Sequence, residues 1–274
     1  MSLAHTLPCR PVVVTAPGWL AIHALALWPH AAWAARRVAD GSDDPLGIAA
    51  LAVLLLWLWR RRESLRATPR LAWLGVASAL TIASTTALFI APPLAAALLA
   101  ALAVSAHAVA WLPDRSPRAA LAGLALLALP LIASLQFYAG YPLRIFTAQF
   151  SAWLLQALGF AAERSGAAMT VNQQLVIVDA PCSGVQMAWL AYFTACSVAL
   201  FTQRRDGAFL RRLPLIGLLV LAGNVLRNTT LVALEVQPQS LAPWLHEAIG
   251  IAWLVVVVGL AARLVAPHRF GASA

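Results

Sequence analysis

Long apolar runs alternate with short turns along the chain, and most of these turns contain proline or arginine. A membrane-spanning α-helix needs roughly 20 apolar residues to cross the hydrocarbon core of a bilayer. Most of the runs reach that length, and the second is clearly shorter. The pattern therefore predicts about eight transmembrane helices, at residues 12–35, 45–59, 71–91, 94–112, 119–139, 183–202, 213–234 and 245–265.

The stretch between the fifth and sixth runs breaks this pattern. Residues 142–160 are amphipathic and interrupted, which is typical of a segment that lies on or dips into the membrane interface, and residues 163–179 form a polar run. We therefore predict an all-α polytopic membrane protein with a single integral domain. Its parts are five helices in 1–139, an external loop with an interfacial segment in 140–181, and three helices in 182–266.

Composition excludes an ordinary soluble domain. Hydrophobic residues make up 62 % of the chain, charged residues 11 %, and the mean hydropathy is +0.80. The net charge of +9 comes from 19 arginines, which lie in short clusters between apolar runs, so it indicates membrane orientation rather than nucleic-acid binding. With the N-terminus inside, fourteen of the 19 arginines are cytoplasmic and the loop at 140–181 is external. The five exceptions are Arg36, Arg37, Arg144, Arg164 and Arg227.

The candidate chemistry begins at Cys182, where the polar run gives way to the sixth apolar run. Pro181 just before it predicts the first turn of a membrane helix. Unpaired amides and the helix dipole favour a thiolate at such a position, so we expect a reactive cysteine. The other two cysteines, Cys9 and Cys196, are interpreted as apolar fillers, and the three cysteines give no spacing for a metal site or a disulfide framework.

Two further polar residues are predicted to reach the same leaflet as Cys182. Arg227 lies about 10 Å below the outer end of the seventh helix, a depth at which an arginine is costly unless it is paired or faces a wet cavity. His246 opens the eighth helix. Such a trio supports acyl transfer: Cys182 attacks a peptide carbonyl and forms a thioester, His246 supplies the acid–base steps, and Arg227 stabilises the oxyanion.

Supporting roles are predicted for residues beside the trio. Asn224 shares a helix face with Arg227 and is expected to orient the guanidinium of Arg227. Asn228 directly follows Arg227 and is a second supporting candidate. Ser183 and Gly184 keep the approach to the sulfur uncrowded. Three polar residues of the loop are predicted to line the substrate entrance: Gln173, Gln174 and Asp179. No metal or cofactor is predicted, and three histidines are interpreted as structural: His23, His30 and His107.

The chain resembles the exosortase/archaeosortase family of membrane cysteine transpeptidases. The resemblance rests on Cys182-Ser183-Gly184 at a helix start, Asn224-x-x-Arg227 in the next helix, and His246 with Gly250 in the last. The apolar run at 175–178, just before the cysteine, also looks like the family's short β-like segment. It implies that Cys182, Arg227 and His246 are catalytic, without a cofactor. It also implies a site on the external face of the bacterial inner membrane. The implied partners are the lipid bilayer and exported proteins with a C-terminal signal of a short motif, a membrane helix and a basic tail.

Other functions stay open from the sequence. A purely hydrolytic intramembrane protease forms the same thioester and differs only in its acceptor. A transporter is disfavoured, because it would place polar residues near the midplane of several helices and carry an inverted repeat. A non-catalytic assembly protein fits the hydropathy but leaves the buried Arg227 without a role.

Overall fold

A computed structural model describes residues 16–237 and 242–267, and most of these residues are helical. The first half of the chain contains α1 (Ala16–Ala39), α2 (Leu46–Arg60), the 3₁₀ turn η1 (Arg62–Ser64), α3 (Leu71–Ile90), α4 (Pro93–Trp111) and α5 (Arg118–Leu127). A long helical run follows, made of α6 (Ile132–Leu135), the π-helical turn η2 (Gln136–Gly140) and α7 (Tyr141–Ala157). The remaining elements are β1 (Ala162–Ser165), β2 (Ala168–Val171), β3 (Gln174–Ile177), the 3₁₀ turn η3 (Ala180–Ser183), α8 (Val185–Phe201), α9 (Asp206–Leu210), α10 (Leu213–Glu235) and α11 (Pro243–Val265).

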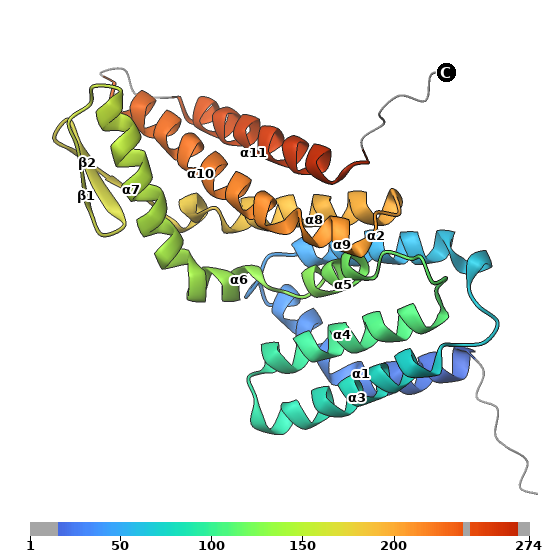
Figure 1. Cartoon of the computed structure of the whole chain (residues 1–274). Coiled ribbons are helices and arrows are strands. Elements are labelled where there is room, and N and C mark those ends of the chain that lie inside the picture. The colour runs from blue at the N-terminus through green and yellow to red at the C-terminus, as the bar shows by residue number, and fades with distance from the viewer. Residues whose placement is uncertain (1–15, 238–241, 268–274) are drawn as a thin grey trace, which may run out of the picture.

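A small sheet corrects the all-α prediction. The three strands pair antiparallel in the order β1-β2-β3 within the stretch that was predicted to be a loop. Gly166, with φ at 62°, provides the left-handed residue of the first turn. Met169 and Val171 on the central strand are fully buried, in a cluster with Leu155 of α7 and Val232 of α10. The sheet therefore packs against the ends of α7 and α10 (Figure 1).

The described residues contain fewer clear membrane spans than the sequence predicts. Four helical stretches are long and apolar enough to cross a bilayer: α3, α4, the α9–α10 stretch and α11. A fifth span results if α5 and the α6–α7 run are counted together, although they are bent by 89°. The apolar helices α2 and α8 are shorter, with 15 and 17 residues. The predicted count of about eight transmembrane helices is therefore not confirmed.

The fifth predicted helix, at residues 119–139, is interrupted. Helix α5 ends at Leu127, three residues before Pro130, whose ring and missing N–H oppose a continuous helix. The side chain of Asp43 accepts a hydrogen bond from the Ala133 amide at 3.2 Å and so caps the start of the next helical run. That run continues to Ala157, and its second half, α7, packs along α10. The segment predicted to be interfacial is thus mainly α7, which belongs to the second member of a bent helical pair.

The helices form three layers (Figure 1). Helices α1, α3 and α4 lie on one side, α7, α10 and α11 on the other, and α2, α5 and α8 between them. The face of α4 is rich in fully buried alanines, among them Ala96, Ala97 and Ala103, and such small residues let helices approach closely in a membrane. The indole of Trp57 donates a hydrogen bond to the Leu200 carbonyl at 3.1 Å and ties α2 to α8.

Candidate active site

Cys182 lies in η3, a single 3₁₀ turn that joins the sheet to α8. Gly184 ends this turn with φ at 86°, a conformation that L side chains rarely adopt, and α8 begins at the next residue. A Cβ at Gly184 would also lie 2.9 Å from Cγ of Asn224. Glycine is therefore required here for two reasons: its backbone conformation and the close approach of α10. Cys182 itself lies in the short turn before α8 rather than in the first turn of that helix.

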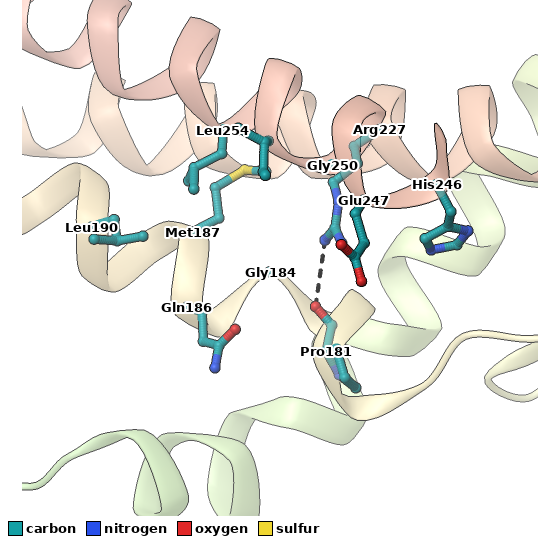
Figure 2. A pocket seen from close by; sticks show the side chains of 11 residues that line it. Pro181, Gly184, Gln186, Met187, Leu190, Arg227, His246, Glu247, Gly250 and Leu254 are labelled. Carbon is teal, nitrogen blue, oxygen red and sulfur yellow. Dashed lines mark hydrogen bonds between the residues drawn. The ribbon is translucent and has the colours of Figure 1, made fainter. Parts of the chain in front are cut away.

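Arg227 reaches from α10 to the turn that carries Cys182. Its Nη1 donates a hydrogen bond to the Pro181 carbonyl at 3.4 Å (Figure 2). Gly250 of α11 faces the guanidinium, and a Cβ added there would make ordinary van der Waals contact with Nε of Arg227 at 3.4 Å. The Nε atom is buried and has no hydrogen-bond partner among the described residues. The guanidinium therefore has donor capacity left for a ligand.

Arg227 and His246 line one cavity of about 430 Å³, between η3, α8, α10 and α11. Its lining is Pro181, Gly184, Gln186, Met187, Leu190, Arg227, His246, Glu247, Gly250, Ile251 and Leu254. Figure 2 shows Glu247 and His246 on the first turns of α11, at the same end of the cavity as Arg227, whereas Leu190 and Leu254 lie at the other end. The cavity thus has one polar end and one apolar end.

Cys182 is half-buried and is not part of the lining of this cavity, although its neighbours Pro181 and Gly184 are. The residue packs against the cluster formed by α7, the sheet and α10. In the described part of the chain no hydrogen bond joins Cys182 to His246 or to the Arg227 side chain. The structure therefore brings Arg227 and His246 together and places the Cys182 turn next to them, without a preformed Cys–His pair.

The electrostatics at Cys182 correct the expectation of a stabilised thiolate. Burial is the main cause and raises the pKa of the thiol above its ordinary value. The charge of Arg227 lowers that pKa, while the charges of Asp179 and Glu235 raise it further. The helix that was expected to stabilise the thiolate begins only at Val185, so the net effect favours the neutral thiol.

Asn224 holds the backbone of Cys182 rather than the guanidinium of Arg227. Its Nδ2 donates to the Cys182 carbonyl at 2.9 Å and to Oγ1 of Thr147 on α7 at 3.0 Å. Asn228, one turn further along α10, donates to Oγ of Ser151 at 3.0 Å. The two buried amides of α10 thus pair with two buried hydroxyls of α7, at matching spacings of four residues.

Thr147 and Ser151 were not identified from the sequence. The signal that could have found them is their spacing of one helical turn in the amphipathic segment, which matches that of Asn224 and Asn228.

Gln136, in the π-helical turn η2, is a second residue that sequence reasoning missed. Its Nε2 donates to the Ala180 carbonyl at 3.0 Å, and its Oε1 accepts a hydrogen bond from Oγ of Ser183 at 3.1 Å. Gln136 therefore binds both ends of the turn that carries Cys182. The side chain of Gln136 lies against Gly140, where a Cβ would be only 2.6 Å from Oε1 of Gln136. π-Helical turns occur frequently at functional sites.

The three residues predicted at the substrate entrance lie in different places. Gln173 belongs to the turn between β2 and β3, and Gln174 is the first residue of β3. Gln173 lines a separate hollow with Glu163 and Phe160. Neither glutamine lines the cavity of Arg227 and His246. Asp179 is exposed directly before η3, and its carbonyl accepts a hydrogen bond from the Cys182 amide at 2.9 Å.

The remaining histidines and cysteines lie away from this cavity. His23 forms a hydrogen bond with Oγ1 of Thr81 at 2.9 Å, and His30 forms one with Oγ of Ser84 at 2.7 Å. His107 is buried, and its ring centroid lies 4.7 Å from that of His23. Cys196 is buried in α8, and Cys9 falls outside the described residues. Within the described ranges, no group of three or more His, Cys, Asp or Glu side chains could hold a metal ion.

Fold and site together define a helical membrane protein in which a cysteine-bearing turn borders a cavity lined by an arginine and a histidine. The sequence model of one family, described as transmembrane exosortase (Exosortase_EpsH), matches residues 33–263. The chain therefore belongs to the transmembrane exosortase family. No curated protein and no solved structure matches the chain.

Proposed function

We propose that this chain is a membrane cysteine transpeptidase that cleaves the C-terminal sorting signal of exported proteins through a thioester. The observation that carries the proposal is the hydrogen bond from Arg227 to the Pro181 carbonyl. It places a permanent positive charge beside the backbone of Cys182, at a cavity to which α11 contributes His246. Membership of the exosortase family supports the same reaction class.

In the proposed first step a C–S bond forms and the C–N bond of the scissile peptide breaks. His246 accepts the thiol proton, Sγ of Cys182 bonds the carbonyl carbon of the scissile peptide, and His246 returns the proton to the leaving amine as the C–N bond breaks. An acceptor nucleophile then attacks the thioester carbon and releases Cys182. Because burial keeps the thiol protonated, proton removal must accompany substrate binding or attack.

Arg227 is assigned to the oxyanion. In the free protein its Nη1 binds a backbone carbonyl, which is chemically the same kind of acceptor as the scissile carbonyl of a peptide. A substrate carbonyl oxygen that takes the place of the Pro181 oxygen would gain negative charge next to the guanidinium. Removal of one such preorganised donor costs about 2.7–4 kcal/mol of transition-state stabilisation in other acyl-transfer enzymes.

The cavity has the polarity expected for a sorting signal. Its polar end, with Arg227, His246 and Glu247, suits the short motif that is cleaved. Its apolar end, with Leu190 and Leu254, leads along α8 and α11 and suits the start of the membrane helix that follows the motif. We assign this end of the protein to the external face of the inner membrane, because most of the arginines lie at the opposite ends of the helices.

The test is co-expression with a tagged candidate substrate. Cys182→Ala should abolish processing, whereas the matched variant Cys196→Ala, which removes a buried thiol from the same stretch of chain, should leave it near normal. A substrate fragment that is covalently bound to Cys182 and released by hydroxylamine would identify the thioester. If Cys182→Ala processed the tagged substrate as well as Cys196→Ala does, the proposal would be refuted.

Transfer and hydrolysis are distinguished in the same assay. Without any added nucleophile, transfer should leave the new C-terminus of the substrate joined to an acceptor, which mass spectrometry detects as a mass above that of the free carboxylate. A product that carries only a free carboxylate in cells would identify a hydrolytic protease instead.

A further inference from the structure

A second, chemically different cavity lies at the far end of α8 from the Cys182 turn. Its volume is about 460 Å³, and it is lined by Asp114, Arg115, Ser116, Arg118, Gln203, Arg204, Arg205 and Asp206. The 17 residues of α8 separate the two cavities by about 25 Å along the helix axis. The cavity is formed where α5, α9 and the loop after α8 meet, and the proposed reaction does not use it.

The two carboxylates of this cavity are occupied by other partners. Asp114 binds Arg70 at 2.7 Å and Arg66 at 3.3 Å, and neither arginine lines the cavity. Oδ1 of Asp206 accepts a hydrogen bond from the Ala119 amide at 2.9 Å and so caps α5.

The four arginines of the cavity have no carboxylate partner. All ten Asp and Glu residues of the sequence lie in the described ranges, and none of them forms an ion pair with Arg115, Arg118, Arg204 or Arg205. Nε of Arg204 is buried and has no acceptor in the described part of the protein. A buried donor without a partner is costly, so the site favours an anion that brings acceptor oxygens.

The surroundings place this cavity at the level of lipid head groups. Arginine side chains lie over aromatic rings at the same end of the molecule, with Arg118 over Trp73 and Arg62 over Trp59. Tryptophan is enriched at the membrane–water interface. Phe201 and Leu210, which end α8 and α9 beside the cavity, are 43 % and 50 % exposed and offer apolar surface for acyl chains.

We propose that this cavity binds the phosphate head group of an anionic phospholipid. The four guanidinium groups supply charge and several donors for phosphate oxygens, and guanidinium geometry matches phosphate well. Basic pockets between membrane helices bind such head groups in other proteins. A bound lipid would connect α5, α9 and the end of α8, and would fix how deeply this end of the protein sits in the bilayer.

The experiment is native mass spectrometry of the purified full chain in detergent, titrated with phosphatidylglycerol and with phosphatidylcholine of the same acyl chains. We expect the wild type to bind phosphatidylglycerol at least about tenfold more tightly. The test variant is Arg115→Gln/Arg205→Gln, since both side chains are exposed and make no hydrogen bond with another described residue, so the fold should be retained. Loss of two charges should weaken phosphatidylglycerol binding by about tenfold or more.

The matched control is Arg61→Gln/Arg62→Gln, which removes the same charge at the same end of the molecule but outside the cavity. It should bind phosphatidylglycerol as the wild type does. Equal binding of the two lipids by the wild type, or an equal loss in both double variants, would overturn the proposal. Displacement of phosphatidylglycerol by an equal concentration of inorganic phosphate would also overturn it, because the site would then be one for free phosphate.

Discussion

The side-chain amide of Asn224 donates a hydrogen bond to the backbone carbonyl of Cys182 at 2.9 Å. This bond ties the candidate nucleophile to α10, the same helix that presents Arg227 one turn later. The amide binds Thr147 as well, so α7, α10 and the Cys182 turn meet at one buried residue. The position of the sulfur relative to the guanidinium therefore depends on Asn224.

Asn224 and Asn228 form a matched pair for testing this dependence. Each is a buried amide of α10 that binds a hydroxyl of α7, but only Asn224 contacts the Cys182 turn. Asn224→Ala and Asn228→Ala should each lower thermal stability, by about 1–3 kcal/mol for the acceptors and donors left unpaired. Only Asn224→Ala should reduce substrate processing per molecule of enzyme by tenfold or more. Similar processing by the two variants would show that Asn224 is merely structural.

The charges around Cys182 predict the pH dependence of thiol labelling. Because the pKa of Cys182 lies above its ordinary value, the thiolate fraction should keep rising through neutral pH and beyond about 8.5, the pKa of a free thiol. The rate of alkylation by iodoacetamide should therefore increase across pH 6.5–9 without a plateau. A plateau below pH 7.5 would identify a stabilised thiolate and contradict this account.

Two charge variants sharpen the same measurement. Arg227 lowers the pKa of the thiol, so Arg227→Gln should slow labelling at pH 8. Asp179 raises that pKa, so Asp179→Asn should speed labelling. Changes in the same direction for both variants would mean that accessibility, and not charge, governs the rate.

Hydropathy was sufficient to predict the long helices. The bounds of α3, α4, α10 and α11 lie within two residues of the predicted ones, because each is one continuous apolar run. The first two strands of the sheet were missed because they have four residues each and β1 carries only one buried side chain, whereas the β-like segment expected at 175–178 overlaps β3. The break at Pro130 was missed because apolar residues continue on both sides of it.

Within the site, sequence spacing indicated which residues are close but not how they bond. Arg227 and His246 line one cavity, since Arg227 lies about two turns before the end of α10 and His246 lies in the first turn of the adjacent α11. The bond from Asn224 to Cys182 and the two bonds of Gln136 depend on how the η3 turn folds back against α10 and η2. The raised pKa of Cys182 likewise comes from burial against α7 and the sheet, which no local pattern reveals.

Gly184 offers a test of the geometry of the turn. Gly184→Ala should be strongly unfavourable, because φ at 86° costs a residue with a Cβ about 1–2 kcal/mol and the new atom would contact Asn224. We expect lower thermal stability and at least a tenfold loss of processing. Gly259→Ala is the control, since a Cβ added at Gly259 in α11 would meet no atom within 4 Å, and it should be neutral or slightly stabilising. Normal processing by Gly184→Ala would contradict the described turn.

The most direct test of the central claim is the activity of Arg227→Lys. Lysine keeps a positive charge but loses the planar set of donors that binds the Pro181 carbonyl and, in the proposed reaction, the oxyanion. Processing of a tagged substrate is measured per molecule of membrane-inserted enzyme, with Cys182→Ser as the zero. We predict normal enzyme levels and processing below about a tenth of wild type, a loss of more than about 1.4 kcal/mol of transition-state stabilisation. Processing above a tenth at normal enzyme levels would contradict the assignment of Arg227 to the oxyanion.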